Sequence, residues 1–469
     1  MASSTAGSSC YPPEPVTLSP EDERTIEMLA DRLVVETLHA SENFTARGRV
    51  ADPRCWKPMK KKDSMVVYQE VANSHQNATR GERLWSEDTV VIPASPRRAT
   101  FDLTTETHLR LQGEDAIGRF QGIRSTCDLN DDKSRGYDGF KKFGARVGSD
   151  DQVLQRFLPE NVPTIFSAGT FPGTVEDMAL AFFADSDERT RTRFNSNKDV
   201  AVDNLKIIAR IHGPTKEDPF RFLGIKWCTN APCWMVSLVV KPRDYLIIES
   251  TGMAFDSNGD RFTYMLNHSI EMDEVPAFRA FGLVRTVFSA CHIMRPYENK
   301  DAAVKIFSRG FLLINGSFGI RGSAAQLAEG FVVIPRMVEE AYSRKLSWMM
   351  ENRCRLSASS GNGTVEDNSF SSSNRSSKAP VEKSSTCPCC HMKMCSRLGS
   401  LLPMNKGDCN LCHQTVCHKC TVKKLLPLEG SRGRQVKTKE LEFCLNCYLK
   451  AKRLSAWQVA LAMLSSTSP

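Results

Sequence analysis

The residues with the clearest capacity for chemistry are cysteines near the carboxyl end of the chain. Ten of the 17 cysteines lie between Cys387 and Cys447, and eight of these ten form Cys-x-x-Cys pairs. Such a turn points two thiolates at one metal ion, and a tetrahedral zinc site needs four ligands. Four pairs therefore predict two structural zinc ions, each bound by four cysteines. The pairs are Cys387/Cys390, Cys409/Cys412, Cys417/Cys420 and Cys444/Cys447.

The stretch "CNLCHQTVCHKC" decides how the pairs combine. Only four residues separate Cys412 from Cys417, which leaves the chain little room to fold back, so these two pairs are not expected to share one ion. Interleaved sites avoid that turn, because the first pair joins the third and the second joins the fourth. Disulfides are the other use of these thiols, and a reducing compartment disfavours them.

The start of the chain indicates a cytoplasmic protein. Its first residues, "MASSTAGSSCYPPEP", lack the basic and then apolar pattern of a secretory signal. No apolar run approaches the roughly 18–20 residues that cross a bilayer. A length of 469 residues predicts two or three domains. We therefore expect a cytoplasmic location, with the cysteines reduced or bound to metal.

The longer, N-terminal part predicts an α+β domain over residues 21–350. Residues 1–20 are rich in proline and are predicted to be disordered. A helix should follow, because Ser19 is a suitable cap, Pro20 suits the first turn, and Asp22 adds a favourable carboxylate.

Strand patterns dominate from Ile207 to Gly310, where "FLGIKWC", "DYLIIESTGMAF" and "DRFTYMLNHSI" are rich in β-branched and aromatic residues. The stretches "SMVVYQEV", "DTVVIPAS" and "CWMVSLVV" are also predicted as strands. Thr174 is expected to cap a helix. A last helix, from Ala324 to about Trp348, should be kinked at Pro335. Antiparallel strands followed by a long closing helix define the α+β class.

Three segments are predicted after this domain. Residues 357–385 include 11 serines and few apolar groups, so they are expected to form a flexible linker. Residues 386–450 hold the cysteine pairs and are expected to form the zinc finger. Residues 451–469 are expected to form a C-terminal helix and tail.

The cysteine region, from Cys387 to Tyr448, resembles the FYVE zinc finger, a cross-braced module with two zinc ions. The shared motifs are "CNLCHQTVCHKCT", "LLP" and "CLNCY". The resemblance implies that Cys387, Cys390, Cys417 and Cys420 hold one zinc ion. It implies that Cys409, Cys412, Cys444 and Cys447 hold the other. The residues left over as bystanders are Cys389, Cys395, His391, His413 and His418, with Cys389 the competitor for the first site.

The sequence departs from the FYVE family at the basic signature that binds phosphatidylinositol 3-phosphate. In that family the signature reads Arg-Arg/Lys-His-His-Cys-Arg. Here Gly407 and Asp408 replace the two histidines, and Asn410 replaces the final arginine. A further arginine of the family corresponds to Glu442. Specific binding of this lipid is therefore not expected.

The positive charge of the cysteine region is compatible with weak membrane binding. From Lys378 to Arg453 there are fifteen Lys/Arg residues and five Asp/Glu residues. The stretch "EGSRGRQVKTKE", with Arg432, Arg434 and Lys439, could attract anionic membranes without specificity. A solvated loop is the alternative. No specific binding of nucleic acid is expected.

Residues from about Gly169 to Met350 resemble a START lipid-transfer domain. The phrases "FLGIKWC" and "RDYLIIESTGMAFDSNGDRFTYMLNHSIEM" and the closing helix carry this resemblance. It implies a helix-grip fold, in which a curved antiparallel sheet wraps the last helix around an apolar tunnel for one lipid or sterol. Family members often carry a buried charged pair in that tunnel. The candidates for it here are Arg210, Glu249 and Arg285.

Together these features predict a non-enzymatic lipid-binding or membrane-associated adaptor in the cytoplasm, with peripheral endosomal membranes as a possible site of action. An alternative is a protein-interaction protein that binds protein partners through a degenerate finger. A weaker alternative is a RING-type ubiquitin ligase, which the spacing around Cys409 and Cys412 does not fit. No catalytic residues are predicted, because phosphate-cradling loops, Gly-x-Ser-x-Gly and His-Glu-x-x-His are absent from the sequence.

Overall fold

The structure is a computed structural model that falls into two compact units. One unit comprises Met1–Val338 with Met463–Pro469, here called the sheet domain, and the other comprises Glu339–Ala462, here called the cysteine module. No helix among the residues described is long and apolar enough to span a membrane. The described residues are 12–71, 123–125, 153–196, 202–230, 241–256, 258–297, 302–315, 319–352, 386–394, 407–427 and 438–465.

Helix α1 (Pro20–Ala46) begins as its sequence predicts. The Ser19 hydroxyl accepts a hydrogen bond from the Asp22 backbone N–H at 3.1 Å, and the Asp22 side chain accepts one in return, which forms a capping box. Just before the helix, the Val16 N–H donates to the Ile208 carbonyl at 2.8 Å. Part of the segment expected to be disordered is therefore hydrogen-bonded to strand β5 (Val202–His212).

One sheet, antiparallel along its main path, forms the centre of the sheet domain. Its main path has the order β1-β2-β4-β11-β10-β8-β7-β6-β5, while β3 pairs with β8 and β9 pairs with β7. The predicted α+β class, with strands closed by a C-terminal helix, is confirmed. The strands are β1 (Trp56–Lys62), β2 (Met65–Glu70), β3 (Ile123–Ser125), β4 (Ile165–Pro172), β5 (Val202–His212), β6 (Phe222–Asn230), β7 (Arg243–Phe255), β8 (Arg261–Met272), β9 (Val284–Arg285), β10 (Val287–Pro296) and β11 (Ala303–Leu313).

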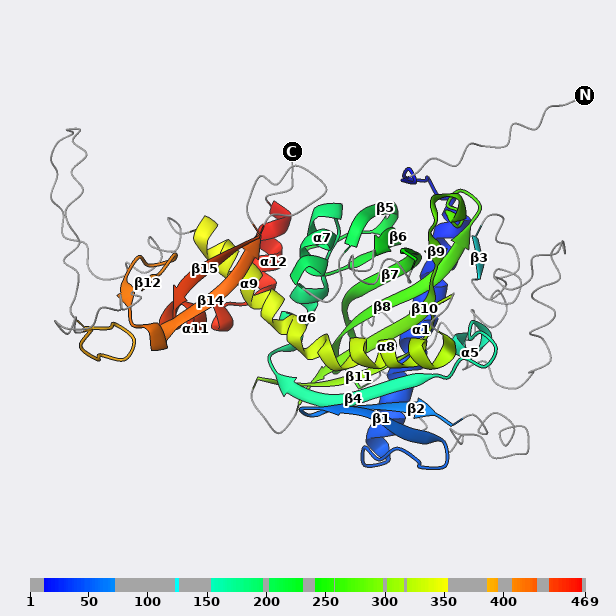
Figure 1. Ribbon diagram of the computed structural model, residues 1–469, viewed down its shortest axis with the longest axis horizontal. Coiled ribbons are helices and arrows are strands. Elements are labelled where there is room, and N and C mark those ends of the chain that lie inside the picture. Colours follow the sequence, from blue (N-terminus) through cyan, green and yellow to red (C-terminus); the bar gives the residue numbers. More distant parts are fainter. Residues whose placement is uncertain are drawn as a thin grey trace, which may run out of the picture. The chain divides into compact units, whose positions relative to one another are not determined.

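Helices cover both faces of this sheet (Figure 1). Alternate side chains of a strand point to opposite faces. On β10, Cys291 and Ile293 join the core that also contains buried residues of α1. Between them, the His292 ring contacts Phe182 of α6 (Val175–Phe182) and Phe331 of α8 (Gly319–Val333). The two faces therefore have separate interiors, one beneath α1 and one beneath α6 and α8.

The remaining helices of the sheet domain connect these layers. The Thr174 hydroxyl accepts from the Asp177 N–H at 3.1 Å, so the predicted cap of α6 is confirmed. The last predicted helix is interrupted at Pro335, as expected, and a 3₁₀ turn, η4 (Ile334–Met337), separates α8 from α9 (Val338–Glu351). The helix begins at Gly319, five residues before the predicted start at Ala324. The prediction began too late because "GIRGS" lacks the apolar spacing that marks a helix face. The other helices are α5 (Val153–Arg156), α7 (Asp187–Ser196) and η3 (Arg279–Phe281).

The cysteine module contains short elements around its cysteines. Helix α9 belongs to this unit, since the division falls between Val338 and Glu339. The sequence placed the boundary in the Ser-rich segment 357–385, which lies outside the described residues, as do "DTVVIPAS" and "CWMVSLVV". The elements are β12 (Gly407–Asp408), β13 (Thr415–Val416), η5 (His418–Cys420), β14 (Thr421–Pro427), β15 (Thr438–Cys444), α11 (Leu445–Arg453) and α12 (Ala456–Ser465).

A carboxyl group on α1 makes the sheet domain sensitive to pH. Burial raises the pKa of Asp31 to about 7, with nearby Arg221 acting against the rise and Glu27 adding to it. In the unfolded chain the same group loses its proton near its ordinary value of 3.8. The native state therefore binds more protons between these two pH values, and this group's contribution to stability falls as pH rises toward 7.

Replacing Asp31 with asparagine removes the cost of ionising this group. We expect D31N to raise the melting temperature of the sheet domain more at pH 8 than at pH 5. Thermal melts of the full chain at both pH values measure the difference. The same shift at both values would contradict the raised pKa.

Candidate functional site

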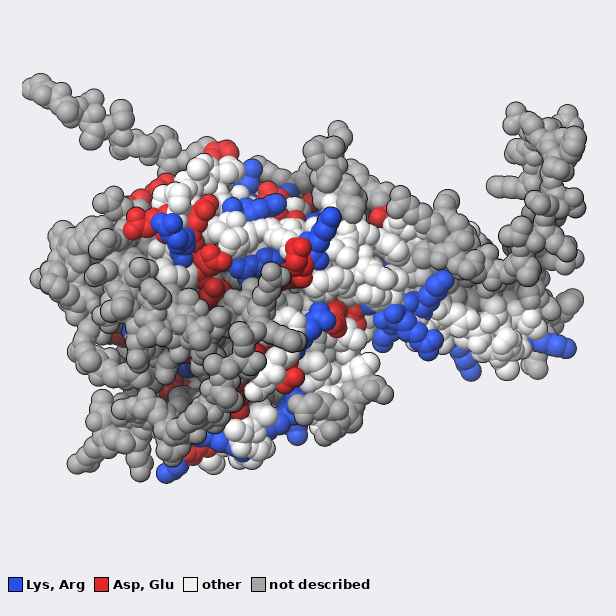
Figure 2. Space-filling view, turned by 180° about the vertical axis from the view of Figure 1, so that it is seen from behind, with Lys and Arg blue, Asp and Glu red and all other residues white. Residues whose placement is uncertain are grey.

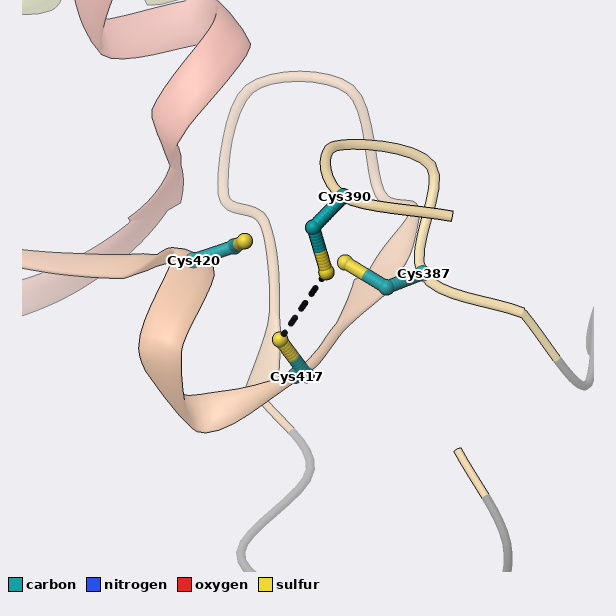
Figure 3. A group of neighbouring side chains, drawn as sticks. All are labelled: Cys387, Cys390, Cys417 and Cys420. Carbon is teal, nitrogen blue, oxygen red and sulfur yellow. Dashed lines mark hydrogen bonds between the residues drawn. The ribbon is translucent and has the colours of Figure 1, made fainter. Parts of the chain in front are cut away.

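The eight paired cysteines form two separate groups in the cysteine module. The first contains Cys387, Cys390, Cys417 and Cys420, whose sulfur atoms all lie within 4.8 Å of one another (Figure 3). The second contains Cys409, Cys412, Cys444 and Cys447, within the same limit. The structure thus brings together the two sets that the FYVE resemblance implies, with the first pair joined to the third and the second to the fourth.

The sulfur spacing suits tetrahedral zinc. Four sulfurs at about 2.3 Å from one ion lie about 3.8 Å from one another. The Cys390 and Cys417 sulfurs are 3.7 Å apart, and the Cys412 and Cys444 sulfurs are 3.8 Å apart. No disulfide forms among these described cysteines. The donor set and its dimensions therefore fit one zinc ion in each group.

The turns around the cysteines explain the two histidines next to them. His391 and His413 each follow the second cysteine of a pair and adopt left-handed backbone angles, with φ of 55° and 59°. Their N–H groups donate to the carbonyls of Cys387 and Cys409, each at 2.8 Å. These residues close the turns through their backbones. Neither they nor Cys389 and His418 belong to a four-cysteine group, and Cys395 lies outside the described residues.

Helix α9 completes the core of the cysteine module. Leu346 and Met349 of α9 pack in one apolar cluster with Cys387, Val416 and Phe443. A module of this size buries few large apolar side chains, so metal and an added helix would both contribute to its stability.

A polar contact reinforces this packing. The Tyr448 hydroxyl of α11 donates to the Glu339 carboxylate at 3.0 Å, and Lys424 of β14 pairs with the same carboxylate. The Tyr342 and Tyr448 rings meet edge to face, with centroids 6.2 Å apart. The sequence did not reveal this role of α9, because the helical pattern continues from α8 into α9 and indicates a single helix.

The positions that a FYVE domain uses for a lipid phosphate carry other contacts here. Asp408, next to Gly407 in β12, accepts a hydrogen bond from the Thr415 hydroxyl at 2.6 Å. The Asn410 side chain donates to the Glu442 carbonyl at 2.9 Å. The Glu442 carboxylate lies 3.4 Å from the Lys423 ammonium. Asp408 and Glu442 thus each place a carboxylate where the FYVE resemblance implies a basic or imidazole group.

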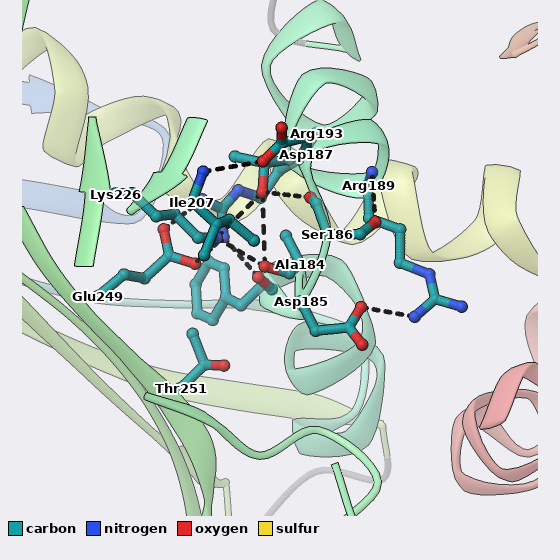
Figure 4. Close-up of polar contacts among 12 residues, drawn as sticks. Ala184, Asp185, Ser186, Asp187, Arg189, Arg193, Ile207, Lys226, Glu249 and Thr251 are labelled. Atoms are coloured by element: carbon teal, nitrogen blue, oxygen red, sulfur yellow. Dashed lines mark hydrogen bonds and ion pairs between the residues drawn. The ribbon is translucent and has the colours of Figure 1, made fainter. Parts of the chain in front are cut away.

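The sheet domain holds a buried ionic cluster beneath α6 and α7 (Figure 4). Glu249 of β7 pairs with Arg193 of α7 at 2.5 Å and with Lys226 of β6 at 2.7 Å. The Lys226 ammonium also donates to the Ala184 carbonyl at 2.6 Å and to the Thr190 hydroxyl at 3.0 Å. All three hydrogens of the ammonium have acceptors, so the cluster fastens α6 and α7 to the sheet.

Burial and charge act in opposite directions on this cluster. Burial lowers the pKa of Lys226 to about 8, although Glu249 acts to raise it. Burial acts to raise the pKa of Glu249, but Arg193 and Lys226 outweigh it and hold the pKa below its ordinary value. Of the predicted candidates for a buried charged pair, Glu249 lies in this cluster. Arg285 instead pairs with Asp244 at 2.8 Å, and Arg210 donates to the Asp185 carbonyl.

Part of the sheet face beneath α8 is fully buried. Accessible surface includes the walls of any void that admits water, and Thr263, Met294 and Ser308 on this face have none. A small pocket of about 30 Å³ lies on the α1 side, where Phe44, Trp56 and Phe166 line it. That space holds one or two water molecules. Asn267 of β8, on the face beneath α8, is only partly buried.

Comparisons with known proteins assign no family. No family model and no curated protein matches the chain. Among solved structures, human STARD10 matches with a TM-score of 0.33 and 9% identity, over 67% of this chain and 82% of that one. The lipid transfer and protein localization domain of human StarD13 matches with a TM-score of 0.32 and 7% identity, over 65% and 95%. Superpositions at this level support no conclusion about function.

The two cysteine groups predict how zinc content responds to substitution. Cys417→Ser removes one ligand from the first site, and the two sites share the segment from Cys409 to Cys420. We expect fewer than one zinc ion per chain in this variant, because metal binding and folding of a small module share one free energy. Elemental analysis of the purified full chain measures the ratio.

The matched control is Cys389→Ser, which changes a neighbouring cysteine outside both groups. Two zinc ions per chain are expected in this variant and in the unchanged protein. A ratio near one in the unchanged protein, or a lost ion in the control, would contradict these two sites.

Proposed function

We propose that this chain is a non-enzymatic lipid-binding adaptor whose C-terminal module is held together by two structural zinc ions. The observation that carries the proposal is the pair of four-cysteine groups, with sulfur separations of 3.7 and 3.8 Å. Four thiolates leave no open coordination position for water or substrate, so the ions would supply stability and not catalysis. The role of the module would be recognition.

The lipid-binding part of the proposal rests on the sheet domain. Its strand phrases resemble START domains, and its antiparallel sheet carries α8 across one face, as a helix-grip fold requires. Apolar side chains such as Met294, Ile306 and Phe331 lie on that face beside buried polar groups, and sites for small apolar ligands combine both kinds of residue. The buried ionic cluster is fully hydrogen-bonded within the protein, which supports a structural role for it and not an enzymatic one.

We place the proposed adaptor in the cytoplasm, at peripheral membranes, because reduced thiols suit zinc sites of this kind. On the face in Figure 2, the coloured side chains of the cysteine module are mostly lysine and arginine, whereas both signs intermix over the sheet domain. A second candidate function is protein recognition by the cysteine module. The carboxylates of Asp408 and Glu442 favour it, because they disfavour a phosphate ligand.

Native mass spectrometry of the intact protein tests the proposal directly. We expect a mass that includes two zinc ions and, in a fraction of molecules, one lipid-sized adduct released on denaturation. Zinc without any adduct, also after incubation with mixed lipids, would favour the protein-recognition candidate.

Liposome binding tests the membrane part of the proposal. Charge-assisted contacts to a phosphate contribute about 1.5–3 kcal/mol each, and this chain lacks several that a FYVE domain would make. Diffuse attraction of basic residues adds at most about 1 kcal/mol each and is screened by salt. We expect weak, salt-sensitive co-sedimentation with anionic vesicles.

The control vesicles carry phosphatidylinositol 3-phosphate or another anionic lipid at equal charge. Both should bind the full chain equally at physiological salt. Tight binding selective for the 3-phosphate would show that Asp408, Asn410 and Glu442 are tolerated in a headgroup site.

A further inference from the structure

A row of neutral polar side chains crosses the face of the sheet beneath α8. Ser167 of β4 lies directly opposite Ser308 of β11, which lies opposite His292 of β10. The Ser308 hydroxyl is 2.8 Å from the His292 Nδ1 atom. All three residues are at most 3% exposed. Three adjacent strands thus bring hydrogen-bonding groups together inside the domain.

The hydrogen bonding of this row is incomplete. Among the described residues, the Ser167 hydroxyl has no hydrogen-bond partner, although it is fully buried. Buried polar groups in folded proteins are nearly always paired, because an unpaired one has lost water without a replacement. An orphaned hydroxyl beside a Ser–His pair therefore marks a place where a ligand can supply the missing partner.

The ionic cluster beneath α6 and α7 does not offer the same opportunity. The Lys226 ammonium already donates to three acceptors, and Arg193 grips both oxygens of Glu249. A ligand there would have to displace bonds to charged groups, which are stronger than neutral ones. The neutral row is the better anchor, although the charged residues are more conspicuous in the sequence.

The surroundings of the row define the chemistry of its ligand. Phe331 of α8 packs against the His292 ring, and Met294 and Ile306 are buried on the same face. Burial lowers the pKa of His292 to about 4, so the imidazole is neutral at physiological pH. The row therefore offers no positive charge for a carboxylate or a phosphate. An apolar molecule with one neutral polar end is the chemical match.

We infer that Ser167, Ser308 and His292 anchor the neutral hydroxyl or carbonyl end of an otherwise apolar lipid, such as a sterol, between the sheet and α8. This inference rests on the proposed lipid-binding function and adds the anchor and the class of lipid. Because these three side chains are at most 3% exposed, binding requires the side chains that cover them to move. Asn267 of β8, only partly buried at the centre of the sheet, marks where this face remains accessible.

Binding of fluorescent lipids to the full chain tests the anchor. The probes are a sterol labelled on its tail, which keeps its free hydroxyl, and a tail-labelled fatty acid with a carboxylate end. We expect the unchanged protein to prefer the sterol, and Ser167→Ala to weaken sterol binding about three- to tenfold, as expected for one lost neutral hydrogen bond. Its melting temperature should not fall, since the hydroxyl has no partner in the free protein.

The matched control is Ser289→Ala, which removes a buried hydroxyl from the opposite face of β10 and should leave sterol binding unchanged. Equal sterol binding by Ser167→Ala and the unchanged protein, or a preference for the fatty acid, would overturn the anchor while lipid binding stands. If neither probe binds the unchanged protein, the anchor and the proposed lipid-binding function both fail.

Discussion

Four thiolates within 4.8 Å of one another repel unless a cation lies among them, and the cysteine module imposes this constraint twice. Each group draws its members from two distant pairs, so the segment from Cys409 to Cys420 is tied into both. The cysteines are held at these positions by two short hairpins, β12–β13 and β14–β15, and by the first turn of α11. Helix α9 then covers the module with Leu346 and Met349. In this account, the module's structure depends on metal-bound sulfur more than on its small apolar core.

The sheet domain depends on a different rule, which is that buried charge must be paired. Glu249 lies between two cations, and each of them also reaches a backbone carbonyl of the α6 region. Removing the carboxylate would leave two buried positive charges without compensation, whereas replacing a whole ion cluster with apolar groups is often neutral. This contrast separates the two polar features beneath α6 and α8. The hydrogen bonds of the ionic cluster are made within the protein, whereas the Ser167 hydroxyl has no partner, which is why we propose it as a ligand anchor.

Sequence reasoning succeeded where the signal is local. Cysteine spacing predicted the two groups, and Ser19 with Asp22 predicted the start of α1, because both depend on residues a few positions apart. The ionic cluster could not be predicted, since Glu249 pairs with residues 23 and 56 positions away on other elements. The left-handed backbone at His391 and His413 was also missed, because glycine usually marks such positions. The assignment of α9 depends on tertiary packing, which the helical pattern does not encode.

Hydrogen exchange of the full chain, with and without a zinc chelator, tests the central claim most directly. We predict that backbone amides around Cys387, from Cys409 to Cys420 and in the Leu346–Met349 turn of α9 lose protection together when zinc is removed. Amides of β7 and β8 in the sheet domain should keep theirs, because their hydrogen bonds do not involve the metal. Unchanged protection of the cysteine module and α9 after complete removal of zinc would contradict a module held together by metal.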